Sequence, residues 1–447
     1  MLTLTINADL VGTRLCYSYA TSDGSEGQIL LRYPECDRLD LRRFLPTVST
    51  GVCVYLAQLC LADRVELAGD LPSGIDLEME VLTGMLYDVR RWKDGTTVDT
   101  TRPGYFASRL AQCASVSDVL DPRRALLMWS GGKDSTLSAI ALRDRGYDVT
   151  ALHVTINQGV QDSERTAVND LAEELRIDLL TVEYEHEHFL EFSSRYAKEW
   201  NRFPRCNVVP FGRDLLLATI AAPVAIASTC QSIVFGHDNE CRHSYVQSDG
   251  HRFPRNDVES AEGAAALQHL LQLSSANDLR ILAPLAMLSE LRILLELVEH
   301  HPGLFARTSF CFWGGNCGRC AKCLRYNLAQ RLAGEPDLLM FRENPLATGV
   351  NPELADLLAA GVRGGVDDGL LFQRQVVYCL ARLVQRGELK PGDDAVTPHI
   401  DDLRALLPDL DRWADDLLVP HAMDEVPPDI ARYWMDGTSD LRSVRGV

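Results

Sequence analysis

The stretch that decides the fold is Ala125-Leu-Leu-Met-Trp129-Ser-Gly-Gly-Lys-Asp-Ser135. It begins as an apolar run of strand length, turns at two consecutive glycines, and opens a segment with helical spacing at about 135–145. Glycines let the backbone turn tightly, so that its N–H groups can converge on an anion, and a helix N-terminus adds unpaired donors and a favourable dipole. The stretch therefore predicts a phosphate-binding loop, with an ordinary strand–turn–helix as the alternative.

The side chains of this loop suit a phosphate ligand. Ser130 and Ser135 can donate hydroxyl hydrogens, Lys133 carries a positive charge, and Asp134 can hold a metal ion or anchor the loop. The spacing is not that of the Walker loop, which has four residues between its first glycine and its Gly-Lys pair.

Strand-like and helical patterns alternate on both sides of the loop. The expected strands after residue 120 are 125–129, 148–156, 178–182 and 232–235, and the expected helices are 135–145, 163–176, 213–229 and 259–273. Such alternation indicates a parallel sheet with helices on both faces, which binds ligands beyond the carboxyl ends of its strands. We predict an α/β protein whose central parallel sheet occupies 121–340.

The two flanks have different patterns. Residues 1–120 predict an N-terminal α+β domain, with strands near 2–6, 15–19 and 29–33 and helices at 48–62 and 78–92. Residues 341–447 predict a helical C-terminal extension, with helices at 351–360, 370–386 and 401–418.

Composition restricts the binding partners and the cellular compartment that we expect for the protein. The 447 residues carry a net charge of −19, which argues against bulk nucleic-acid binding, because phosphate neutralisation needs clustered Lys and Arg. The N-terminus has no basic region leading into an apolar run, and the longest apolar stretch, Gly51–Ala62, is too short to span a bilayer. We expect a cytoplasmic protein without a membrane segment.

Four cysteines lie within 13 residues: Cys311, Cys317, Cys320 and Cys323. Two consecutive C-x-x-C steps place three thiolates on one loop, and Cys311 can complete a tetrahedron. Four sulfurs without an open position suit structural Zn²⁺, and an iron–sulfur cluster is the alternative. A disulfide is disfavoured in the reducing cytosol.

The loop at 130–135 resembles that of the PP-loop, or N-type, ATP pyrophosphatase superfamily, whose fold is the adenine-nucleotide-hydrolase-like sheet. The resemblance implies that ATP is split between its α and β phosphates with the help of Mg²⁺, that AMP is attached to a carboxylate or carbonyl oxygen, and that a nitrogen or sulfur nucleophile then attacks. On this resemblance, ATP and pyrophosphate bind to Ser130, Gly131, Gly132, Lys133, Asp134 and Ser135. Its catalytic members are Lys133, Asp134 and Ser135.

The loop and the cysteine knuckle together resemble 7-cyano-7-deazaguanine synthase (QueC). Weaker similarities add Asn157-Gln158-Gly159, the Val209–Asp214 segment, Gly236-His237-Asp238, Phe253-Pro254 and Ala283-Pro284-Leu285. The resemblance covers about 123–333 and implies a substrate of the 7-carboxy-7-deazaguanine type, bound near Arg213, Asp214, Gly236, His237 and Asp238.

Three departures from the family pattern fall where the substrate or the second half-reaction is handled. Asp214 replaces an Asn, Ser289-Glu290 replaces Thr-Lys, and Arg255-Asn256 replaces Asp-Cys. The family enzyme first makes an amide with ammonia and then dehydrates it to a nitrile. The activation chemistry is expected to be retained here, whereas the nitrile step is in question.

The size of the chain resembles that of the QueC-like proteins of antiphage operons, type IV CBASS and the Qat system. In that group the activated carboxylate is thought to be joined to an amine, such as the N-terminus of a partner protein from the same operon. The flanks could instead support the fold or form a homodimer. A housekeeping synthase, a tRNA-modifying PP-loop enzyme and a non-catalytic nucleotide sensor are the alternative functions.

Asp214, His237, the pair His186 and His188, and Arg325 each have a functional and a structural interpretation. Asp214 could accept hydrogen bonds from a purine or cap a helix, and His237 could be a general base or a loop hydrogen-bonding residue. His186 and His188 look like metal ligands, but the polar end of a strand is preferred. Arg325 could orient phosphate or pair with a carboxylate.

Overall fold

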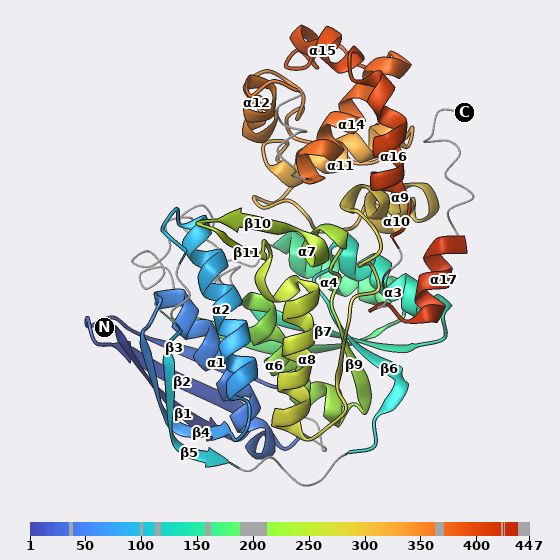
Figure 1. Cartoon of the computed structure of the whole chain (residues 1–447). Coiled ribbons are helices and arrows are strands. Elements are labelled where there is room, and N and C mark those ends of the chain that lie inside the picture. Colours follow the sequence, from blue (N-terminus) through green and yellow to red (C-terminus); the bar gives the residue numbers. More distant parts are fainter. Residues whose placement is uncertain are drawn as a thin grey trace.

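The computed structural model describes residues 1–34, 39–98, 102–111, 118–156, 162–187, 212–362, 371–421, 423 and 425–436. Its main feature is one ten-stranded sheet in the order β12-β9-β6-β7-β8-β3-β2-β1-β4-β5 (Figure 1). A separate two-stranded hairpin consists of β10 (Tyr245–Ser248) and β11 (His251–Pro254).

The predicted parallel sheet forms the centre of this structure. Its strands are β6 (Asp121–Met128), β7 (Asp148–Ile156), β8 (Asp178–Glu187), β9 (Cys230–Val234) and β12 (Arg280–Leu282), and all neighbours among them pair in parallel. The connecting helices are α3 (Lys133–Asp144), α4 (Asp162–Glu174), α6 (Arg213–Ala227) and α8 (Ala261–Ser275). The expected elements are therefore present, with ends that differ by a few residues.

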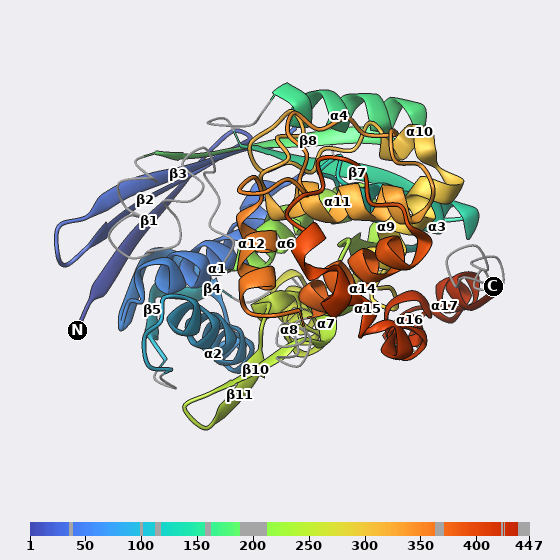
Figure 2. The same ribbon diagram turned by 90° about the horizontal axis from the view of Figure 1, so that it is seen from above.

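Helices cover both faces of the sheet, as the alternation of side chains requires. Along β6, Ala125 and Leu127 pack into a core with α3 and α4, whereas Leu126 packs into a second core with α6 and α8. Figure 2 shows α4 on the opposite side of the strands from α1 (Leu41–Cys60) and α2 (Asp76–Lys93). Two cores thus position the carboxyl ends of the strands from both sides.

The N-terminal strands extend the same sheet. β1 (Thr3–Val11), β2 (Arg14–Thr21) and β3 (Glu26–Arg32) confirm the three expected strands, and β3 pairs antiparallel with β8. Two further strands, β4 (Arg64–Pro72) and β5 (Gly104–Ala111), were not among the predicted strands. The backbone hydrogen bonding continues across residue 120, so the division at 120 and 340 remains a prediction.

Helices dominate the C-terminal region. The described helices there are α12 (Pro352–Ala359), α14 (Leu371–Arg386), α15 (Ile400–Arg404), α16 (Leu410–Leu418) and α17 (Pro428–Asp436). The expected single helix at 401–418 is wrong: a 3-10 turn at Leu407–Asp409 interrupts it, since Pro408 has no N–H to donate. Of these helices, α12 and α14 pack on α11 (Ala321–Leu332) and α16 packs on α9 (Glu290–His300), whereas α15 packs on α14 and α17 on α3 (Figure 1).

Candidate active site and metal centre

The phosphate loop joins β6 to α3 at the carboxyl edge of the sheet. Gly131 has φ +64°, and a Cβ there would lie 2.9 Å from the backbone N of Val168, so both conformation and space require glycine. The carbonyl of Gly131 accepts from Ser309 N at 2.8 Å, which ties the loop to the segment before the cysteine knuckle. Gly132 caps α3 without a side-chain bond among the described residues, so the first N–H groups of α3 are available to an anion.

Lys133 is buried in a network of charges. Its Nζ lies 2.5 Å from Asp134 Oδ1 and 3.5 Å from Glu290 Oε1, and Glu290 Oε2 lies 3.1 Å from a terminal nitrogen of Arg325. Burial alone would lower the pKa of Lys133, but Asp134 and Glu290 raise it well above its ordinary value. The loop lysine is therefore held as a cation beside the anion site.

The segment after β9 lies directly against the loop. A Cβ on Gly236 would be 2.6 Å from the Cβ of Asp134, so only glycine allows this approach. Asp238 follows as the N-cap of α7 (Asn239–His243), where its Oδ1 accepts from Cys241 N at 2.9 Å. Burial, partly offset by Lys133 and reinforced by Asp134, raises the pKa of Asp238 to about 6.

The structure also brings together the predicted substrate residues at the start of α6 and after β9. His237 Nε2 lies 2.7 Å from Asp214 Oδ2, and Arg213 Nε lies 2.9 Å from Asp214 Oδ1. Arg213 also reaches Glu259 Oε1 at 3.5 Å. Burial opposes ionisation of Asp214, but Arg213 and His237 together hold its pKa well below the usual range, so the carboxylate stays charged.

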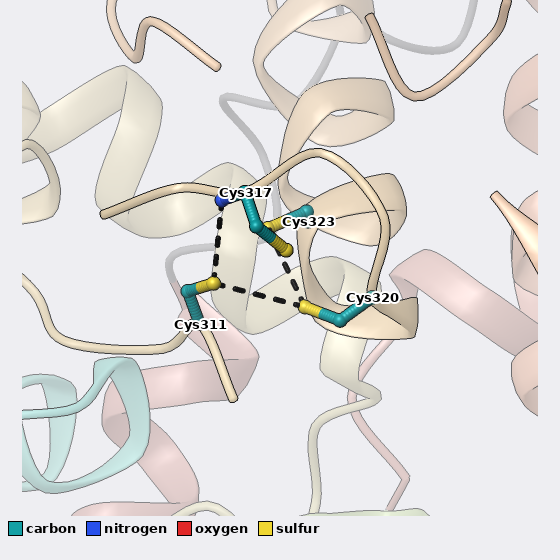
Figure 3. A group of neighbouring side chains, drawn as sticks. All are labelled: Cys311, Cys317, Cys320 and Cys323. Atoms are coloured by element: carbon teal, nitrogen blue, oxygen red, sulfur yellow. Dashed lines mark hydrogen bonds between the residues drawn. The ribbon is translucent and has the colours of Figure 1, made fainter. Parts of the chain in front are cut away.

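The four cysteines of the knuckle converge at the start of α11 (Figure 3). The Sγ separations are 3.4 Å for Cys320–Cys323, 3.8 Å for Cys317–Cys323 and 4.0 Å for Cys320–Cys311. Sulfurs at 2.3 Å from one tetrahedral ion are about 3.8 Å apart, so the set fits a single Zn²⁺. The loop between the cysteines turns tightly at Gly318, which has φ +82°. Only glycine fits there, because a Cβ would lie 2.0 Å from the carbonyl oxygen of Glu343.

Two residues of the site were missed from the sequence. Gln375 of α14 donates a hydrogen bond to Glu240 Oε1, and Glu240 Oε2 accepts from Glu290 N at 3.1 Å. This chain of contacts connects the C-terminal helices to the carboxylate that pairs with Lys133. Nothing in the sequence signals it, since Glu240 and Gln375 are 135 residues apart.

Other expectations have separate outcomes. His186 contacts the hydroxyls of Tyr19 and Tyr184, and burial lowers its pKa to about 3, so the interpretation as a polar strand end is preferred over a metal ligand. His188, Asn157-Gln158-Gly159 and the 209–211 part of the Val-Pro motif lie outside the described residues. No helix in the described part of the chain is long and apolar enough to cross a membrane.

The part of the chain that carries the loop and the knuckle is similar in sequence to known proteins. Residues 124–333 match the family model described as "Queuosine biosynthesis protein QueC", so the centre of the chain is a QueC-like domain. Enzymes of the QueC family are ATP-dependent carbon–nitrogen ligases.

Curated relatives match over the same half of the chain. A 7-cyano-7-deazaguanine synthase from Campylobacter jejuni subsp. doylei is 26% identical over 235 residues, which cover 49% of this chain and 99% of the relative. Two archaeal synthases, from Sulfurisphaera tokodaii and Saccharolobus solfataricus, are 26% and 27% identical, and the match covers 48% and 49% of this chain. The chain spans about half the length of these archaeal relatives, 47% and 48%.

Proposed function

We propose that this protein uses ATP to activate the carboxylate of a 7-deazaguanine and transfers the acyl group to an amine. The observation that carries the proposal is the loop at 130–135. It presents free helix N–H groups and a buried cationic lysine at the carboxyl edge of a QueC-like sheet. A carboxylate oxygen attacks the α-phosphorus, the bond to the bridging oxygen breaks, and pyrophosphate leaves. The amine then attacks the acyl carbon, AMP leaves, and one proton is released.

The residues of the loop explain the first half-reaction. Backbone N–H groups and Lys133 stabilise the charge that develops on pyrophosphate. Asp134 and Asp238 are the carboxylates that would hold Mg²⁺, which would neutralise phosphate charge when bound. Burial and the negative charge of Asp134 both raise the pKa of Asp238, so a cation bound between these carboxylates would favour their ionised forms.

The zinc knuckle has a structural role in this proposal. Its four ligands leave no open coordination position, and α11, which begins at the knuckle, carries Arg325 to Glu290. By holding the start of α11, the metal would position Arg325 and Glu290, the carboxylate that pairs with Lys133, without contacting the substrate.

We also propose that the amine belongs to a partner protein of an antiviral operon. The Campylobacter jejuni synthase aligns over 99% of its length with only 49% of this chain. The remaining half offers a surface that the Campylobacter jejuni synthase lacks. The position of Glu290 where the family has Lys further separates this site from one that makes a nitrile.

The deciding assay mixes the enzyme, ATP and 7-carboxy-7-deazaguanine with either ammonia or proteins from neighbouring genes, and follows intact masses. We expect a protein adduct whose added mass equals that of 7-carboxy-7-deazaguanine minus water. It should be absent with Lys133→Ala and retained with Lys390→Ala, a substitution of a half-exposed lysine elsewhere. A nitrile product with ammonia and no protein adduct would overturn the protein acceptor. It would instead support a housekeeping synthase.

A further inference from the structure

We infer that His237 is the proton acceptor for the attacking amine and that Asp214 positions it. This inference deepens the proposed function and rests on it. Asp214 stands where the resembling family has Asn, and His237 occupies a position that the family motif leaves open. The structure joins these two positions into one hydrogen-bonded pair.

The hydrogen bonds determine which ring nitrogen is available. Ionised Asp214 accepts from His237 Nε2 at 2.7 Å, so the neutral ring carries its proton on Nε2 and its lone pair on Nδ1. Nδ1 is buried and has no hydrogen-bond partner among the described residues. A buried nitrogen without a partner is costly, which indicates that a ligand group completes it.

Neighbouring side chains fix the orientation of the ring. Phe235 stacks on it with centroids 5.0 Å apart and an interplanar angle of 16°. Arg213 holds the other oxygen of Asp214 at 2.9 Å. Both Asp214 and His237 are more than nine-tenths buried, so solvent competes little for the pair.

The position of the pair suits acyl transfer rather than pyrophosphate release. His237 is one residue beyond Gly236, whose backbone packs on Asp134 of the phosphate loop. It thus follows β9 at the sheet edge where the acyl-adenylate is expected, without itself belonging to the phosphate loop.

The proton balance of the step is simple. As the amine nitrogen bonds to the acyl carbon it becomes cationic, and one N–H proton passes to His237 Nδ1. The carbon–oxygen bond to the AMP phosphate breaks, and AMP leaves with the electron pair. Asp214 stabilises the imidazolium and stays ionised throughout.

The same cluster could be read as a cation site, because Asp214, His237 and Glu259 place ligand atoms within 4.8 Å of one another. Arg213 already supplies positive charge to both carboxylates, at 2.9 and 3.5 Å. We therefore argue for the Asp–His pair, and treat metal binding as an outcome of the test. Besides Asp214, the charged groups that act on the ring are Glu259 and Glu425, and Asp134 packs on the adjacent Gly236.

The test separates the two half-reactions in His237→Gln and Asp214→Asn. Carboxylate-dependent ATP–pyrophosphate exchange reports activation, and amide formation reports transfer. We expect exchange within about threefold of the wild type, and transfer about 10²- to 10⁴-fold slower in His237→Gln. The weakly basic nucleophile hydroxylamine, which needs less help from a general base, should partly rescue transfer in His237→Gln. His269→Gln, at a largely exposed histidine, is the matched control.

Three results would overturn the inference. Equal losses of exchange and transfer would place His237 in carboxylate binding or activation. Unchanged transfer in His237→Gln would leave the ring no catalytic role. A second metal ion per chain, lost in Asp214→Asn but kept in Cys320→Ser, would make the cluster a cation site. Absence of exchange in the wild type would instead refute the proposed function itself.

Discussion

At the scale of single residues, the proposed function depends most on Lys133. Asp134 and Glu290 keep it charged despite burial, so its ammonium is available to pyrophosphate without a change of protonation. We expect Lys133→Ala to lower carboxylate-dependent pyrophosphate exchange by about 10²- to 10³-fold. It should also lower the melting temperature, because Asp134 and Glu290 lose a buried counter-charge. Exchange kinetics and a melting curve check this. Near-normal exchange would contradict the role of the loop.

Glu259 gives a pH prediction at the same scale. Burial, reinforced by Asp214, raises its pKa to about 7, so between about pH 4.5 and 7 the folded state binds the proton more tightly than the unfolded state. The free energy of unfolding therefore falls as pH rises through this window. Glu259→Gln should flatten the fall, which urea unfolding at pH 5 and pH 8 would measure. An unchanged slope would contradict the assigned protonation.

The sequence could predict those site residues that lie in contiguous motifs. Residues 130–135 and Gly236-His237-Asp238 are local patterns with a chemical meaning, and the structure places them together. The contact of Gln375 with Glu240 could not be predicted from the sequence. Neither residue lies in a recognisable motif, and only the fold brings the two together.

At the scale of elements, the cysteine knuckle makes a direct prediction. One zinc ion per chain should be measured by metal analysis, and Cys320→Ser should lose it and destabilise α11. Cys16→Ser, at a partly exposed cysteine of β2, should keep the metal. Visible absorbance from iron and sulfide in the wild type would contradict a zinc site.

The contact between α1 and α6 gives a second prediction for elements. A Cβ on Gly51 would lie 1.9 Å from Thr219 Oγ1. The side chain of Thr219 on α6 therefore packs directly against the backbone of α1 at this glycine. We expect Gly51→Ala to lower the free energy of unfolding by about 1–3 kcal/mol. Gly303→Ala, where a Cβ meets nothing within 4 Å, is the control. Equal stability of the two variants in urea would contradict this close packing.

Periodicity predicted the long elements well and the exceptions have physical causes. β7 was predicted over its observed residues, 148–156, because valine, isoleucine, threonine and other strand-favouring residues dominate this run. β5 was not predicted, because it lies at the sheet edge and many of its side chains face solvent. β4 was not predicted either, although it lies inside the sheet between β1 and β5. The prediction of one helix over 401–418 was too long, because the helical spacing of apolar residues continues through Pro408.

At the scale of the molecule, one sheet crosses the expected boundary at residue 120. Removing residues 1–118 would expose the edge of β8 that pairs with β3, together with the apolar surface of α6 that packs on α1. We expect such a truncation to aggregate in size-exclusion chromatography. A monodisperse, active truncation would show that the N-terminal part is a separable module. This continuity was not predictable, since strand pairing between distant segments leaves no local pattern.

The central claim is that the carboxylate of a 7-deazaguanine attacks the α-phosphorus of ATP at the loop of Lys133. The most direct measurement uses 7-carboxy-7-deazaguanine labelled with ¹⁸O in its carboxylate, an amine acceptor and mass spectrometry of the AMP released. The account predicts one ¹⁸O atom in each AMP, because the bond that breaks in the second step joins the acyl carbon to that oxygen. Unlabelled AMP, or ADP in its place, would contradict it.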